Sequence, residues 1–253
     1  MNKKKYESKS VVSSYINMRL QNPEVMILVK YREFIAGKHV LDIGCGSGRT
    51  TAILKNLSKG YVGLDYSLEM IESCRKRFVG VSFIHGDVRE MSEFKDEEFD
   101  YVMFSFNGLD SINHEGRIKG LSEIRRVLRQ DGLFVFSSHN RNYRYAISRP
   151  KMEISTTPCK QAGNFIKFFK STRNRLRSKN HQVFNEQYAI INDVAHNYAM
   201  LTYYIDKENQ ISQLEDEGFE TIEMYDTLGN ILNLGSDDKE SAWIYYVTRK
   251  INK

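Results

Sequence analysis

Residues 38–48 read Lys-His-Val-Leu-Asp-Ile-Gly-Cys-Gly-Ser-Gly, a short apolar run that enters a cluster of three glycines. A glycine-rich turn after a buried strand lets a ligand approach backbone N–H groups closely. The dinucleotide fingerprint needs G-x-G-x-x-G, but the third glycine comes one residue early and Arg49 stands in its place. The sequence also has no P-loop pattern G-x-x-x-x-G-K-[ST]. The competing interpretation is a tight turn that binds nothing.

Outward from this loop, strand-like and helix-like segments alternate as far as residue 138. Strands are predicted at 39–43, 61–65, 81–84, 99–106 and 133–136, and, after a break, at 219–225 and 242–248. Helices are predicted at 47–57 with Ser47 as its cap, after a cap at Ser67, at 116–129 and at 207–217. Strands joined by crossover helices indicate a parallel sheet with right-handed connections.

Two acidic residues follow neighbouring strands. Asp65 ends the second strand, 17 positions after Gly48, where a carboxylate can accept hydrogen bonds from a ribose. Asp87 follows the third strand, where a carboxylate can accept from an adenine amino group. Singly, each acid reads as a solvated loop residue. Because the carboxyl ends of parallel strands meet at one edge of the sheet, the acids and the loop together predict an adenosine site without a pyrophosphate cradle.

Five stretches carry a family resemblance: 40–48, 63–67, 86–88, 99–107 and 123–135. Together they resemble the class I S-adenosylmethionine-dependent methyltransferases of the small-molecule type, over about residues 38–138 with a return at 207–249. The resemblance implies an α/β fold with a Rossmann-like, seven-stranded, mostly parallel sheet. It further implies helices on both faces, an antiparallel last strand, and a cap inserted after strand 5.

The resemblance also implies S-adenosyl-L-methionine as the cofactor. Asp42 and the glycines would line its methionine part, Asp65 would hold the ribose hydroxyls, and Asp87 with Val88 would contact the adenine. Tyr15 would close over the cofactor as a lid residue, or else pack a helix onto the domain. The full set of predicted cofactor contacts is Tyr15, Asp42, Gly44, Cys45, Gly46, Gly48, Asp65, Tyr66, Asp87, Val88 and, beneath the sulfonium, Ser105, Phe106 and Asn107.

The resemblance identifies no catalytic base. His139 directly follows the fifth strand, at the edge that faces the cofactor, and histidine titrates near neutral pH. We interpret His139 as a general base or an acceptor ligand, or else as a histidine that hydrogen-bonds a loop. Asn107 and Asn140 could orient a polar acceptor. No His/Asp cluster in the sequence suggests a metal site.

The net charge of +5 is unevenly distributed. Residues 141–185 hold 11 Lys and Arg but one acid, Glu153, which makes this segment +10 and the remainder −5. We predict a helical lid segment at 1–36, a core at 37–140 and 201–253, and an acceptor-binding cap at 141–200. The basic cap could hold an anionic small molecule, dock RNA, or lie on a membrane surface as an interfacial helix. It could also be a solvated face.

The predicted function is methyl transfer to an oxygen or nitrogen of a small polar molecule such as a sugar or other metabolite, and an anionic acceptor would fit the basic cap. The alternatives are RNA methylation through the basic cap, and a non-catalytic module that binds S-adenosylmethionine or its product. Three scattered cysteines, the lack of an apolar leader after the basic N-terminus, and the lack of an apolar run of about 20 residues predict a cytoplasmic protein without a membrane span.

Overall fold

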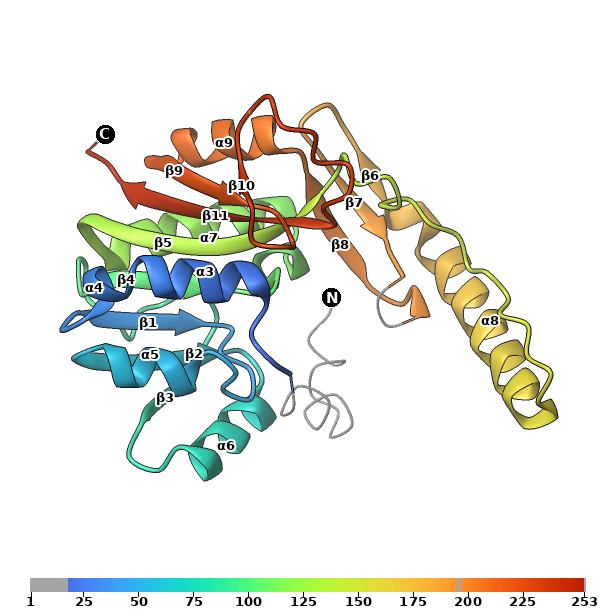
Figure 1. The fold of residues 1–253 in the computed structure, drawn as a ribbon, viewed down its shortest axis with the longest axis horizontal. Helices are drawn as coiled ribbons and strands as arrows, with labels where there is room; N and C mark the ends of the chain where they lie inside the picture. Colours follow the sequence, from blue (N-terminus) through green and yellow to red (C-terminus); the bar gives the residue numbers. More distant parts are fainter. Residues whose placement is uncertain (1–17, 195–196, 253) are drawn as a thin grey trace.

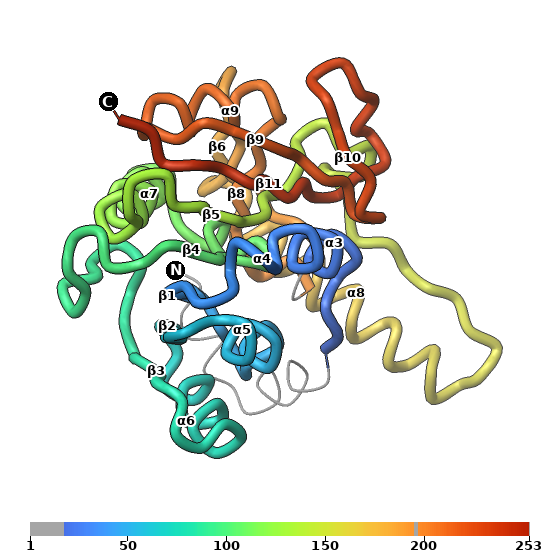
Figure 2. Tube along the Cα trace, turned by 60° about the vertical axis from the view of Figure 1, so that its left-hand side comes forward, coloured from blue at the N-terminus to red at the C-terminus, as the bar shows by residue number. Residues whose placement is uncertain are grey.

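The computed structural model describes residues 18–194 and 197–252. Its centre is a twisted sheet with the strand order β10-β9-β11-β5-β4-β1-β2-β3 (Figures 1 and 2). The strands of this path are β1 (His39–Ile43), β2 (Gly60–Asp65), β3 (Ser82–His85), β4 (Phe99–Phe104), β5 (Leu128–Asn140), β9 (Phe219–Tyr225), β10 (Ile231–Leu232) and β11 (Trp243–Lys250).

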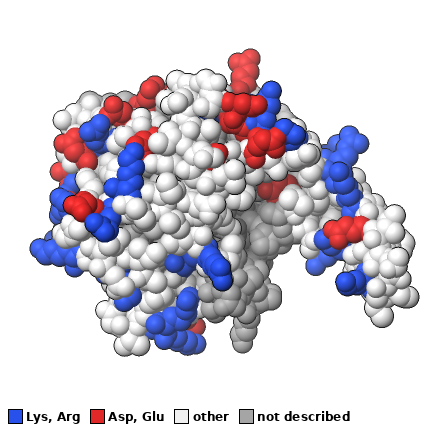
Figure 3. All heavy atoms as spheres, in the orientation of Figure 1, with Lys and Arg blue, Asp and Glu red and all other residues white. Residues whose placement is uncertain are grey.

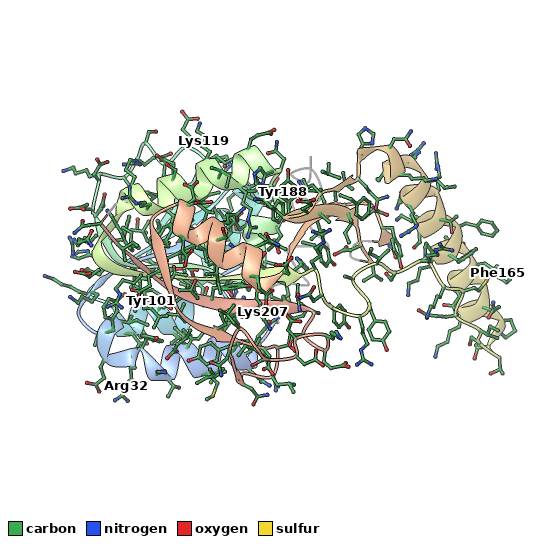
Figure 4. All side chains as sticks on the ribbon, turned by 90° about the horizontal axis from the view of Figure 1, so that it is seen from above. Arg32, Tyr101, Lys119, Phe165, Tyr188 and Lys207 are labelled. Carbon is green, nitrogen blue, oxygen red and sulfur yellow. The ribbon has the colours of Figure 1, made fainter. Side chains whose placement is uncertain are left out.

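Helices cover both faces of the sheet. One apolar core contains residues of α7 (His114–Val127) and α9 (Lys207–Asp216). The other contains residues of α3 (Asn22–Lys30), α4 (Arg32–Ile35), α5 (Thr51–Leu57) and α6 (Leu68–Arg77). Lys119 on α7 and Arg32 on α4 accordingly lie on opposite sides of the sheet in Figure 4. Strands that are buried on both faces read as nearly continuous apolar runs, as β1 and β4 do.

The predicted fold class is confirmed. β1 pairs in parallel with β2 and β4, β4 pairs in parallel with β5, and β2 with β3. β11 runs antiparallel to both β5 and β9, which gives the expected antiparallel hairpin at the end of the chain. All seven predicted strands are present.

The strand count is larger than seven in the described residues, because the segment after β5 returns to the sheet. β8 (Leu201–Ile205) pairs in parallel with the last two residues of β5, beyond the point where the pairing with β4 ends. β7 (Tyr188–Asn192) and β6 (Val183–Phe184) continue from β8 in antiparallel order. β7 and β8 are five residues long, like β1, and largely buried, but they lie after residue 138, where the alternation of strand-like and helix-like segments stops.

Two predicted boundaries need correction. The helix after the glycine loop begins at Thr51, and Ser47 lies in the turn before it, because Gly44, Gly46 and Gly48 all have positive φ. The helix predicted at 116–129 spans His114–Val127 and is capped by Asn113, which accepts from the amide of Gly116. The Ser67 cap is confirmed, since its hydroxyl accepts from the amide of Met70.

The segment predicted as a cap contains the long helix α8 (Pro158–Ser178), followed by a 3-10 turn at Lys179–His181. In Figures 1 and 2, α8 extends away from the sheet. Its division from the core and from a lid segment stays a prediction. Tyr15 and residues 1–17 of the predicted lid lie outside the described residues, and the rest of that segment contains α3 and α4.

Candidate functional site

A cavity of about 490 Å³ lies at the carboxyl ends of β1, β2 and β4. Open α/β sheets bind ligands at this edge. Ten of the predicted cofactor contacts line the cavity: Asp42, Gly44, Cys45, Gly46, Asp65, Tyr66, Asp87, Val88, Ser105 and Phe106. Residues from four separate stretches of the chain therefore meet at one site. Gly48 and Asn107 do not line it.

The glycine loop turns tightly above the cavity. Gly44 has a φ of 61°, and a Cβ at this position would lie 2.7 Å from Cε2 of Phe104, so both the backbone and the packing require glycine. Gly48 also has positive φ, but its hydrogen faces the ring of Phe78 on the side of α6. The structure thus gives Gly48 a packing role, and it does not place the residue against the cavity.

Asp65 connects the loop to the second strand. One carboxylate oxygen accepts from the amide of Gly46 at 2.9 Å, and the other accepts from the amide of Ser67 at 2.8 Å. Each oxygen keeps a second lone pair, so the carboxylate can also accept from two adjacent ribose hydroxyls. Burial raises the pKa of Asp65 to about 6, because the charged form loses hydration.

Asp87 occupies a more open position at the end of β3. Its carboxylate is paired with the guanidinium of Arg89, at 2.6 Å between Oδ2 and Nη2, and both side chains are roughly half exposed. Val88, the next residue, is buried in the apolar core that contains residues of α7. An acid next to an apolar wall suits an adenine ring, which has an amino donor at its edge and apolar faces.

Asp42 is buried at the base of the same cavity. Its Oδ2 accepts from the hydroxyls of Thr50, at 2.6 Å, and Tyr61, at 2.8 Å. Burial raises the pKa of Asp42 from its ordinary 3.8 to about 6. The protein therefore keeps a poorly hydrated carboxylate beside the cavity at neutral pH, as suits a site for a cationic amine.

Replacing Asp42 by Asn should stabilise the ligand-free protein at pH 8 by about 1–3 kcal/mol. The raised pKa means that the contribution of this carboxyl to stability is present below about pH 4 and is lost as the pH rises through 6. The Asn oxygen can keep both hydroxyl donors while the charge disappears. Urea unfolding at pH 8 and at pH 4 measures the effect, and an equal gain at both pH values would contradict it.

Sequence reasoning missed a buried polar cluster that joins α3 to the cavity. Glu24, which is fully buried, pairs with Arg49 and accepts from the hydroxyls of Ser105 and Tyr245. The guanidinium of Arg49 lies 5.1 Å from the ring centre of Phe106. Glu24 sits in an ordinary amphipathic helix pattern, so nothing in the sequence marks it. Its cluster connects the N-terminal helix to the predicted sulfonium end of the site.

A second cluster surrounds His139, and sequence reasoning missed its central residue. Asp110 is 1% exposed, and its Oδ2 accepts from both the backbone amide and Nδ1 of His139, each at 2.7 Å. Its Oδ1 accepts from Arg117 at 2.6 Å and from Ser138 at 2.7 Å. Asp110 follows the fourth strand within the stretch Asn-Gly-Leu-Asp, which looks like an ordinary turn in the sequence.

His139 is thereby held in one orientation. Because a carboxylate faces Nδ1, the proton of the neutral ring lies on Nδ1 and the lone pair lies on Nε2. The amide nitrogen of Asn107 lies 3.3 Å from that Nε2. The side chain of His139 is 19% exposed, so Nε2 is the ring atom through which it can meet an acceptor.

Phe106 and Asn107 connect this cluster to the cavity. Both have φ near +57°, a conformation that costs a bulky residue energy and recurs at functional sites. The strained turn places Phe106 in the cavity wall and Asn107 against His139. The oxygen of the Asn107 side chain is buried without a hydrogen-bond partner in the described part of the chain. The cavity and the His139 cluster thus share two consecutive residues.

This combination defines a doubly wound α/β domain with an adenosine-type site at its switch edge. Residues 40–132 match the family model described as a methyltransferase domain. This part of the chain is therefore similar to the methyltransferase domains that the model describes, as the resemblance to S-adenosylmethionine-dependent methyltransferases led us to expect.

The chain is similar to known methyltransferases in sequence and to a solved structure in fold. The chain is 38% identical over 104 residues to a demethylmenaquinone methyltransferase of Clavibacter sepedonicus, covering 40% of this chain and 41% of the relative. It is 32% identical over 114 residues to a fatty-acid O-methyltransferase of Mycolicibacterium smegmatis, covering 43% and 40%. The chain thus spans less than half the length of either relative. An S-adenosylmethionine-dependent methyltransferase structure from Clostridium acetobutylicum superposes with a TM-score of 0.64 at 12% identity, covering 94% and 95% of the two chains, which shows the shared fold.

Proposed function

We propose that the protein binds S-adenosyl-L-methionine and transfers its methyl group to an oxygen or nitrogen of a small molecule. The observation that carries this proposal is the convergence of Asp42, Asp65 and Asp87 on one cavity below the glycine loop. Three acids suit a ligand with an amine, two ribose hydroxyls and an adenine amino group, and they would repel the pyrophosphate of a dinucleotide.

The cofactor, when bound, supplies the reactive methyl group and a leaving thioether. The chain itself holds and orients the reactants. Asp65 accepts from the ribose hydroxyls, Asp87 accepts from the adenine, and Asp42 attracts the amine of the methionine part. Ser105 and Phe106, at the end of β4, line the wall where the methyl group would be presented. Alignment of donor and acceptor is the main contribution that a methyltransferase makes to the rate.

His139 takes the proton of the acceptor. Asp110 fixes its ring and stabilises the imidazolium that forms. In the free protein the amide of Asn107 donates to the Nε2 lone pair, and the acceptor's hydroxyl or ammonium takes the place of that amide before its proton moves to Nε2. A base of this kind serves an acceptor hydroxyl or a protonated amine, which must lose a proton for the reaction to proceed. This supports a polar reacting group on the acceptor. The demethylmenaquinone and fatty-acid methyltransferases among the relatives indicate that such a group can be attached to an apolar body.

Calorimetry with S-adenosylhomocysteine tests the cofactor site. The protein should bind this product, and Asp65→Ala should weaken binding by more than about tenfold, because a hydrogen bond to a charged group contributes about 1.5–3 kcal/mol. Glu72→Ala, which removes an exposed acid from α6, is the matched control. An unchanged affinity for Asp65→Ala would contradict the ribose assignment. A methyl-transfer assay against a panel of acceptors then separates an enzyme from a non-catalytic binder.

A further inference from the structure

The helix α8 presents an apolar row to solvent. Phe165, Phe169 and Leu176 are spaced by four and seven residues, so they lie along one side of the helix. They are 44%, 66% and 67% exposed, and Ile166 beside them is 69% exposed. Figure 4 shows Phe165 on α8 far from the sheet. Large side chains of this kind are normally covered when they gather in one row.

The opposite side of α8 holds the helix to the rest of the chain. Asn174 donates to the carbonyl of Asn197 at 2.9 Å, and Arg175 donates to the carbonyl of Ser148 at 2.6 Å. Ser171 between them is the one buried residue of the helix. These contacts hold one side of α8 against the rest of the protein. The apolar row lies on the other side and therefore faces solvent.

The same outward side is strongly basic. Lys170, Arg173 and Arg177 are spaced by three and four residues in the row next to the apolar one, and all three are exposed. Their side chains have no hydrogen bond or ion pair within residues 18–194 and 197–252. The helix contains no acidic residue. Figure 3 shows Lys and Arg side chains on the part of the molecule that projects to the right, where Figure 1 places α8. Glu153 is the one acidic residue of 141–185.

We propose that α8 docks the protein on an anionic membrane surface, with Phe165, Phe169 and Leu176 inserted between the headgroups and Lys170, Arg173 and Arg177 on the lipid phosphates. A helix with an apolar row beside basic residues and no acid is complementary to an anionic bilayer in both charge and polarity. RNA would use the basic residues equally well, but it has no site for exposed Ile166 and Leu176. The apolar row therefore selects the lipid surface.

The position of α8 suits this role. In Figure 1 the arrow of β1 points toward the side on which α8 projects. The cavity lies at the carboxyl end of β1, so α8 and the cavity lie at the same end of the molecule. Docking by α8 would bring the site toward the bilayer. The docking itself rests on the helix alone and does not depend on methyl transfer.

Co-sedimentation with vesicles tests the proposal. The full chain should bind vesicles of equal parts phosphatidylcholine and phosphatidylserine at least about tenfold more tightly than vesicles of phosphatidylcholine alone. Phe165→Ser/Phe169→Ser should weaken binding at both low and high salt. Arg173→Gln/Arg177→Gln should weaken it mainly at low salt, because salt screens the attraction to the lipid phosphates.

Matched controls remove similar groups elsewhere. Val29→Ser/Val79→Ser replaces two exposed apolar residues outside α8, and Lys59→Gln/Lys76→Gln replaces two exposed lysines outside α8. Both should bind vesicles as the unmodified chain does. No sedimentation of the unmodified chain, or equal losses in the controls, would overturn the proposal. So would salt-dependent binding to RNA without vesicle binding, or self-association that Phe165→Ser/Phe169→Ser abolishes. Unchanged binding of S-adenosylhomocysteine in the α8 variants would show that any loss is confined to docking.

Discussion

Replacing His139 by Gln should lower methyl-transfer turnover by about a hundredfold, which is the usual contribution of a positioned general base. The affinity for S-adenosylhomocysteine should stay within about twofold, because His139 is not among the residues that line the cofactor cavity. Gln keeps a polar side chain of similar length but cannot accept a proton at neutral pH. A large loss of turnover with little change in affinity for S-adenosylhomocysteine is the result expected for a general base.

The measurement is turnover at saturating cofactor with an acceptor found in the panel, recorded from pH 5 to pH 9. Turnover of His139→Gln should stay low across this range, because Gln cannot take the proton of the acceptor at any of these pH values. His181→Gln, which changes an exposed histidine beyond α8, is the matched control and should behave like the unmodified chain. Full activity of His139→Gln with the same pH profile would remove His139 as the base.

Replacing Asp110 by Ala should lower the free energy of unfolding by about 3–5 kcal/mol, since it leaves a buried cation without its counter-ion. Arg117 is completely buried. Among the described residues, its guanidinium donates to Asp110 and otherwise only to neutral side-chain oxygens, those of Gln210, Gln213 and Ser138. The ring of Tyr203, 4.5 Å from the guanidinium carbon, adds a weaker attraction. No other carboxylate forms an ion pair with Arg117 in the part of the chain that the structure describes.

Urea unfolding of a double-mutant cycle checks this expectation. Asp110→Ala/Arg117→Met removes both charges and should be more stable than Asp110→Ala alone, because Met fills the buried volume without needing a partner. Asp110→Asn should fall between Asp110→Ala and the unmodified chain, since it keeps an acceptor for Arg117. Losses that simply add in the double variant would show that the buried charge is not the cause. A destabilised Asp110 variant with normal His139 chemistry would separate the structural role from the positioning role.

Much of the cofactor site could be predicted because it is built from local signals. Gly44 and Gly46 are needed at positive φ directly after β1, and Asp65 and Asp87 each end a strand or follow one immediately. In a parallel sheet these local positions meet at one edge whatever the rest of the chain does. Ten predicted residues therefore line the cavity, although Gly48 faces α6 and Tyr15 lies outside the described residues.

The amino-acid sequence by itself determined the order of the seven predicted strands, the glycine loop and the acids of the cavity, because each depends on neighbours in the chain. Only the tertiary structure decided which distant residues are partners. Asp110 pairs with His139 and Arg117, and Glu24 pairs with Arg49 and Ser105. These residues come from separate segments, and no hydrophobic pattern in the sequence predicts that those segments meet. The outward side of α8 was decided in the same way, by hydrogen bonds to Ser148 and Asn197. Such contacts depend on how the layers of the fold pack together. A buried polar group needs a hydrogen-bond partner, but a partner from a distant part of the chain produces no repeating pattern in the sequence.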